Sequence, residues 1–220
     1  STEHRALARE AVGKSLVLLK NEHATLPLPA DNGPYLIAGV AADDLGVQCG
    51  GWTIDWQGKR GEATPGGTTI LAALRHELSD PEMAIYKPSG TWDQSMPPKA
   101  AVVVVGEAPY AEGNGDAEKL SLSPEDMNVV ANVSRLNVPI VLVVLSGRPL
   151  ELGIAHDAAA AVVAAWLPGT EGAGVADVLF GRTAPTGKLS FTWPESTSQQ
   201  PINSGDDKQP LYPLGHGLSY

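Results

Sequence analysis

The stretch of sequence that decides the fold is AAVVVV at residues 100–105, followed by Gly106. The run is apolar without interruption, and it lacks the alternation of apolar and polar residues that marks a strand with one face in water. It therefore predicts a strand that is covered on both faces. Similar apolar runs predict further strands at residues 35–41, 84–86, 139–145, 160–166 and 189–193. The shorter of these runs predict a strand only weakly.

Segments with helical periodicity lie between these apolar runs. We predict helices at residues 3–19, 69–78 and 170–180, and a fourth that starts at Pro124. Ser123 is the expected N-cap of the fourth helix, Thr68 the expected cap of the second, and Gly181 the expected end of the last. Because strands and helices alternate, the fold class is α/β. We expect one domain over residues 1–220, with a doubly wound, mainly parallel sheet and helices on both faces.

Composition excludes several classes of function. The 220 residues carry 15 Lys and Arg against 25 Asp and Glu, a formal net charge of −10, and no block of basic residues, which argues against a nucleic-acid partner. No apolar run reaches the roughly 20 residues that a membrane-spanning helix needs. Cys49 is the only cysteine, so the chain has no internal disulfide. The chain opens on polar residues with no signal peptide, a start that we interpret as a boundary between two domains.

The loop after residues 100–105 is the first candidate for chemistry. It holds Glu107, Glu112 and Asp116 among glycines, directly past a buried strand. In open parallel sheets, ligands bind where strands end at their carboxyl edge. A carboxyl group with a raised pKa at such a place can act as a general acid, and the spacing does not choose between Glu107 and Glu112. A polar loop in water accounts for the same residues.

The second candidate is the glycine-rich loop at residues 49–58, which carries Trp52 and Trp56. Two indoles in five residues suit stacking against the apolar face of a sugar ring. Asp55 and Gln57 could form hydrogen bonds to sugar hydroxyls. The alternative is that the indoles simply cover the core.

Other motifs argue against competing chemistries. Residues 181–188 imitate a phosphate-binding loop, but five residues separate the glycines where four are needed, and Leu189 replaces the required Ser or Thr. The five histidines show no metal-ligand spacing, and the chain has no Gly-x-Ser-x-Gly element. The sequon at Asn132 falls in the predicted fourth helix. We therefore expect no cofactor and no metal, and a nucleotide-binding domain is the least supported alternative.

Six ordered motifs spread over nearly the whole chain resemble those of one known family, the C-terminal domain of family 3 glycoside hydrolases. The similarity is greatest to its exo-β-glucanase (β-glucan glucohydrolase) branch. The motifs are Ala8–Asn21, Gln48–Thr53, Val105–Glu112, Leu167–Gly172, Pro185–Leu189 and Tyr212–Leu218.

The resemblance implies a six-stranded α/β sandwich that belongs to an exo-acting β-glucosidase or β-glucan glucohydrolase. By the match at Pro109-Tyr110-Ala111-Glu112, Glu112 is the implied general acid/base, with Glu107 as the runner-up. Trp56 is the residue implied to stack on the sugar at the leaving-group side.

The family's nucleophile is an aspartate in a separate N-terminal barrel domain, and no motif of this chain matches it. The implied partners are therefore that barrel and β-glucan oligosaccharides, and we expect the chain alone to be inactive. The resemblance favours a periplasmic or extracellular location over a cytoplasmic one. A non-catalytic carbohydrate-binding domain is the alternative function.

Overall fold

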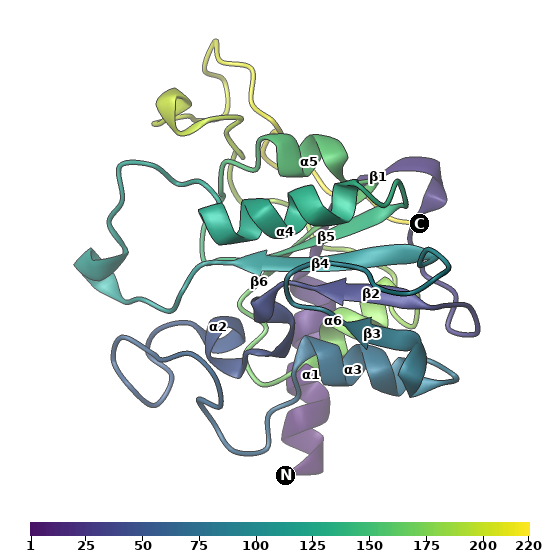
Figure 1. Ribbon diagram of the computed structural model, residues 1–220. Coiled ribbons are helices and arrows are strands. Elements are labelled where there is room, and N and C mark those ends of the chain that lie inside the picture. Colours follow the sequence, from purple (N-terminus) through teal and green to yellow (C-terminus); the bar gives the residue numbers. More distant parts are fainter.

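Six strands form one sheet in the order β1-β6-β5-β4-β2-β3 in the computed structural model, which describes residues 1–220 (Figure 1). The five strands from β6 to β3 in this order are parallel, and β1 pairs antiparallel with β6 at the edge. The strands are β1 Val17–Asn21, β2 Tyr35–Ala38, β3 Ala84–Tyr86, β4 Ala100–Gly106, β5 Ile140–Leu145 and β6 Ala161–Trp166. The fold class predicted from the sequence is confirmed.

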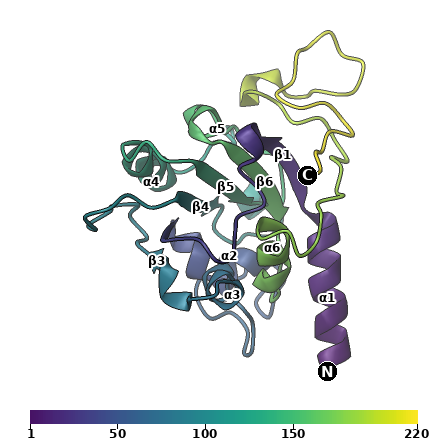
Figure 2. The ribbon, with the colours of Figure 1, turned by 90° about the vertical axis from the view of Figure 1, so that its right-hand side faces the viewer.

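Helices cover both faces of this sheet, as Figure 2 shows. One face carries α1 Thr2–Ser15, α3 Ile70–Glu77 and α6 Gly172–Leu179, and the other carries α4 Pro124–Ser134 and α5 Ile154–Ala158. The short helix α2 is Leu45–Cys49. Single turns of 3₁₀ helix are η1 Glu22–Ala24, η2 Val40–Asp43, η3 Pro81–Met83, η4 Glu112–Gly115 and η5 Thr197–Gln199.

The valine run of β4 divides its side chains between two cores. Val102 and Val104 belong to a cluster of 29 buried residues beneath α1, α3 and α6. Val103 and Val105 belong to a cluster of 22 buried residues beneath α4 and α5. Successive side chains of a strand point to opposite faces. An unbroken apolar run is therefore what a sheet with two buried faces requires.

The first predicted helix is too long. It ends at Ser15, and Val17–Asn21 is the edge strand β1. Leu18 packs into the core under α1, whereas Val17 and Leu19 pack into the other core. A short apolar segment does not reveal by its own periodicity whether it is helical, and here pairing with β6 decides.

Two smaller expectations are also wrong. The cap of α3 is Thr69, whose hydroxyl accepts a hydrogen bond from the backbone N–H of Ala72 at 3.1 Å, and not Thr68. Residues 189–193 form no strand, although Leu189 and Trp193 are buried against the sheet. By contrast, Ser123 caps α4 as expected, and Gly181 follows α6 with a φ of +72°.

The order of the strands opens a crevice between β2 and β4. The chain leaves β2 for α3 on one face of the sheet and leaves β4 for α4 on the other. Loops that depart to opposite faces leave room between them at the carboxyl edge of the two strands. The loop from β4 to α4 extends furthest at this edge, on the left in Figure 1.

Candidate active site

The loops that follow α2, β4, β5 and β6 meet at the carboxyl edge of the sheet. They line a small cavity of about 50 Å³. Its walls come from Gly50 and Gly51 after α2, from Glu107 after β4, from Ser146 after β5 and from Leu167 after β6. This is the place at which the sequence predicted the chemistry.

Glu107 lies at the centre of a hydrogen-bonded network in this edge. Its carboxylate accepts hydrogen bonds from Ser146 Oγ at 2.6 Å and from Tyr110 Oη at 3.1 Å. It also forms an ion pair with Arg148, whose Nη2 lies 2.6 Å from Oε1. The Glu107 side chain is 19% exposed. Burial raises the pKa of Tyr110, and the neighbouring Glu107 carboxylate raises it further.

Arg148 also holds the far end of the same loop. Its Nη1 donates a hydrogen bond to the Gly115 carbonyl at 2.6 Å. Its guanidinium carbon lies 4.7 Å from the centre of the Tyr110 ring, a cation–π distance. One side chain from the loop after β5 therefore fixes both ends of the segment from Glu107 to Gly115.

Glu112 lies within that segment, at the start of η4. Its side chain is exposed and forms no hydrogen bond or ion pair in the structure. Its φ of +52° is in the left-handed region, which costs a non-glycine residue on the order of 1–3 kcal/mol. The preceding Ala111 is buried, and its backbone N–H donates to Gln57 Oε1 at 2.9 Å. The surroundings thus hold the Glu112 backbone while its carboxyl group stays free.

Two glycines allow the close packing around Tyr110. A Cβ atom on Gly115 would lie 2.3 Å from Tyr110 Cδ2, and one on Gly51 would lie 2.1 Å from the Tyr110 carbonyl oxygen. Both distances are shorter than any ordinary contact. The loop at residues 49–58 and the Glu112 loop therefore pack directly against each other.

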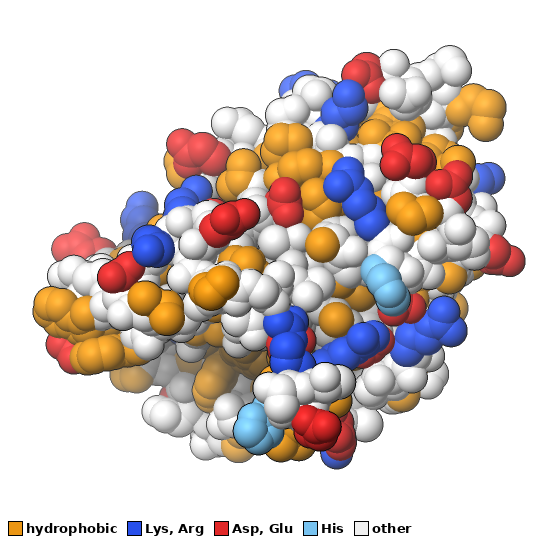
Figure 3. Space-filling model, turned by 90° about the horizontal axis from the view of Figure 1, so that it is seen from below, with side chains coloured by type: hydrophobic (Ala, Val, Ile, Leu, Met, Phe, Trp, Pro, Cys, Tyr) orange, Lys and Arg blue, Asp and Glu red, His pale blue; other side chains and the backbone are white.

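Trp52 and Trp56 project from the first of these loops instead of covering the core. They are 68% and 54% exposed, their ring centres are 6.2 Å apart, and Ile54 between them is also exposed. Hydrophobic side chains gather at the left-hand end of the face in Figure 3, the end at which Figure 1 places this loop. Exposed aromatic side chains that lie next to one another are typical of binding surfaces, which makes this loop a candidate for one.

The two polar residues of the tryptophan loop have partners within the protein. Asp55 forms an ion pair with Lys59 at 3.3 Å. Gln57 accepts the hydrogen bond from Ala111, and its Nε2 atom is buried without a partner. Gln57 therefore joins the tryptophan loop to the Glu112 loop.

The sequence interpretation missed Ser146 and Arg148. The signal that could have found them is Ser-Gly-Arg directly after the apolar run of β5, the same position relative to its strand that Glu107 has after β4. No group of three or more His, Cys, Asp or Glu side chains lies close enough to bind a metal ion. None of the helices is both long and apolar enough to cross a membrane.

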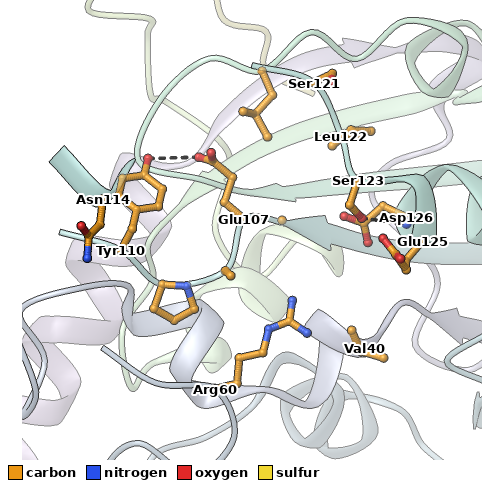
Figure 4. A pocket seen from close by; sticks show the side chains of 14 residues that line it. Val40, Arg60, Glu107, Tyr110, Asn114, Ser121, Leu122, Ser123, Glu125 and Asp126 are labelled. Carbon is orange, nitrogen blue, oxygen red and sulfur yellow. Dashed lines mark hydrogen bonds between the residues drawn. The ribbon is translucent and has the colours of Figure 1, made fainter. Parts of the chain in front are cut away.

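A wider pocket of about 580 Å³ opens on the other side of the Glu107 side chain, in the crevice between β2 and β4 (Figure 4). Tyr110 and Asn114 lie on one side of it, and Ser123 and Asp126 lie at the start of α4 on the other. Burial raises the pKa of Asp126, although hydrogen bonds from Ser123 and from the Gly106 backbone oppose the shift.

Known proteins are similar to this chain in both sequence and fold. It is 30% identical over 244 aligned residues to a lysosomal beta glucosidase from Dictyostelium discoideum, an alignment that covers 99% of this chain and 30% of that protein. A solved exo-1,3/1,4-beta-glucanase from a Pseudoalteromonas species superposes on all of this chain and on 28% of its own length, with a TM-score of 0.89 and 42% identity.

A beta-glucosidase from Listeria innocua, solved with gluconolactone, superposes with a TM-score of 0.82 and 27% identity over all of this chain and 34% of its own. The chain thus spans about a third or less of the length of these relatives. Residues 16–220 match the sequence profile of the glycosyl hydrolase family 3 C-terminal domain. The chain therefore belongs to the family of glycosyl hydrolase family 3 C-terminal domains.

Proposed function

We propose that this domain supplies the general acid/base of a retaining, exo-acting β-glucosidase or β-glucan glucohydrolase. Glu112 donates a proton to the oxygen of the departing sugar while an aspartate of an N-terminal barrel domain attacks the anomeric carbon. Glu112 then removes a proton from water, which releases glucose from the covalent intermediate.

The contrast between the two glutamates carries the choice of Glu112. Glu107 accepts hydrogen bonds from three side chains, so its oxygens are occupied within the protein. Glu112 is exposed and unpaired, and its backbone is held in a left-handed conformation between two fixed points. A free carboxyl group on a fixed backbone is what proton transfer to a bound leaving group needs. Glu107 is then a positioning residue.

Trp56 contributes the surface on which the leaving-group sugar stacks. Its indole is exposed on a loop that Gln57 ties to the Glu112 loop. A flat aromatic face in this position suits the apolar face of a pyranose ring.

The catalytic division between two domains makes their docking essential. The two carboxyl groups of a retaining glycosidase lie about 5–5.5 Å apart. A misplacement of about 1 Å can lower the rate about a hundredfold. The lone chain is therefore inactive.

Reassembly tests this proposal. The chain, a separately produced barrel domain and their mixture are assayed with an aryl β-glucoside. Turnover only in the mixture is the expected result. Turnover by the lone chain would refute the assignment of the nucleophile to another domain.

The exposed indoles favour a second candidate, a carbohydrate-binding domain without catalysis. It predicts that β-glucan oligosaccharides bind this chain tightly with no barrel present, which titration calorimetry measures. The Trp56→Ala variant is the control for binding at the tryptophan loop.

A further inference from the structure

The pocket between β2 and β4 has no part in the proton transfer described above. Its walls include Val40 after β2, Gly106 at the end of β4, Glu107 after β4, and Asp126 on α4. It therefore occupies the point at which the loops of neighbouring strands depart to opposite faces of the sheet. Doubly wound proteins bind ligands at this point. Its volume of about 580 Å³ lies within the range of roughly 300–1,000 Å³ found for small-molecule sites.

Several polar groups in the pocket have no partner within the protein. The Arg60 guanidinium, the Asn114 amide and the Glu125 carboxylate form no hydrogen bond or ion pair with other residues. In Figure 4 the guanidinium of Arg60 is directed from the lower rim toward the space between Glu107 and Glu125. These groups are free to exchange hydrogen bonds with a bound molecule.

Asp126 provides a more buried contact on the same side. It is 7% exposed, and it stands at the start of α4 beside Ser123. Its carboxyl group already accepts hydrogen bonds from Ser123 and from the Gly106 backbone, and the lone pairs that these bonds leave free can accept hydrogen bonds from ligand hydroxyls.

The balance of charge and surface selects the class of ligand. The charge of Glu107 is already paired with Arg148. Of the other charged residues that line the pocket, two are acidic, Glu125 and Asp126, and one is basic, Arg60. A phosphate or another anion is therefore disfavoured, and the side chains do not form a metal site. Five of the fourteen lining residues are hydrophobic, so a purely apolar ligand also fits poorly.

A neutral sugar matches this combination of unpaired polar groups and apolar side chains. Its hydroxyls can pair with the arginine, amide and carboxylate groups, and its C–H face can lie on the apolar residues of the pocket. The hydrophobic lining residues are Val40, Ala108, Pro109, Leu122 and Leu150.

The pocket also adjoins the proposed catalytic loop. Tyr110 and Asn114, which flank Glu112 in the sequence, both line it. Pro109 in its wall contacts the tryptophan loop, since a Cβ atom on Gly58 would lie 2.7 Å from Pro109 Cβ. A chain of sugar units whose bond is cleaved at Glu112 can therefore continue from Trp56 into this pocket.

We propose that the pocket lined by Arg60, Asn114 and Asp126 is a distal subsite that binds a glucosyl unit of the β-glucan chain on the leaving-group side. This inference rests on the proposed role of Glu112. With this subsite, the enzyme prefers substrates that are oligosaccharides longer than a disaccharide.

Binding to this chain is the first test. Amide chemical shifts are followed by NMR during titration with laminaritetraose and with cellotetraose. Shifts at Arg60, Asn114 and Ser123 are expected with at least one of the two sugars, and Arg60→Ala and Asn114→Ala should remove them. Arg135→Ala is the matched control. Arg135 is likewise an exposed arginine, but it lies at the C-terminal end of α4, whereas the pocket lies at the N-terminal end of this helix. Unchanged thermal unfolding of the variants excludes a folding defect.

Kinetics in the complete enzyme are the second test. Arg60→Ala should raise KM for the tetrasaccharide about tenfold, the loss expected for a hydrogen bond to a charged group. It should leave kcat/KM for an aryl β-glucoside unchanged.

The two tests separate the subsite from the proposed function. If Glu112→Ala abolishes proton donation but the pocket shows neither shifts nor an effect of chain length, the subsite is overturned and the function stands. If Glu112→Ala has no such effect, the function and the subsite both fail.

Discussion

The Arg148 guanidinium lies 2.6 Å from the Glu107 carboxylate, and this ion pair fixes the loop that carries Glu112. The same arginine donates to the Gly115 carbonyl, eight residues further along the loop. A hydrogen bond from Ala111 to Gln57 holds the middle of the loop. The proposed proton donor is therefore placed by contacts that it does not itself make.

Removal of Arg148 should destabilise the domain. Arg148→Ala leaves the partly buried Glu107 carboxylate without its counter-ion and the Gly115 carbonyl without its donor, so we expect a loss of roughly 2–3 kcal/mol in the free energy of unfolding. Urea denaturation measures it. Arg148→Lys keeps the charge but loses the forked contact, and it should recover only part of the loss. Equal stability of wild type and Arg148→Ala would contradict the role of the pair.

The two glutamates should differ in their dependence on the leaving group. In the complete enzyme, Glu112→Ala should lower kcat/KM about 10²–10⁴-fold for an alkyl β-glucoside and far less for a dinitrophenyl β-glucoside, which needs no proton. Azide should restore turnover of the activated substrate by taking the place of the deprotonated water. If Glu107→Ala gives this pattern and Glu112→Ala does not, the acid/base is Glu107.

The hydrogen bond between the two loops should act on rate more than on stability. Gln57→Leu removes the acceptor of the Ala111 N–H, at a cost of about 1–3 kcal/mol in unfolding free energy. Because Ala111 precedes Glu112, loss of this hydrogen bond should also loosen the position of the Glu112 carboxyl group. We therefore expect kcat for poor leaving groups to fall even under conditions in which the variant is fully folded, with KM little changed. Gln57→Glu keeps an acceptor at the same position and should retain most of kcat. A rise in KM alone would show that Gln57 binds substrate and does not position Glu112.

Two neighbouring glycines offer a matched comparison of packing. Gly115→Ala would place its Cβ 2.3 Å from the Tyr110 ring, whereas Gly113→Ala meets no atom closer than 3.9 Å. We expect Gly115→Ala to lose about 1–3 kcal/mol of stability and Gly113→Ala to lose little. Thermal unfolding compares the two variants, and similar losses would rule out the clash with Tyr110 as the cause.

Stability should fall at alkaline pH because of Tyr212. Burial raises its pKa to about 12, above the ordinary value near 10. The folded state thus favours the protonated phenol, so its contribution is complete below pH 10 and is lost between about pH 10 and 12, by about 1.4 kcal/mol per pH unit. Tyr212 Oη also lies 2.7 Å from His156 Nε2. Urea denaturation across this range should show a shallower decline in Tyr212→Phe, and an identical slope would exclude Tyr212 as a source.

Local sequence information was sufficient for several elements in which burial or a cap left a pattern in a few neighbouring residues. The valine run indicated the doubly buried strand β4, and Ser123 before Pro124 indicated the start of α4. It was insufficient for Val17–Asn21, because a strand at the edge of the sheet is defined by its pairing with β6, nearly 150 residues away.

The class of the fold and the loop on which the candidate glutamates lie could both be read from the chain alone, since hydrophobic patterning and strand ends are local properties. The surroundings of each glutamate could not, because they form only when the chain folds. Arg148 is 41 residues from Glu107 in the chain, and Gln57 is 54 residues from Ala111. The parallel sheet brings their loops to one edge, and such long-range contacts leave no periodicity in the sequence that would reveal them.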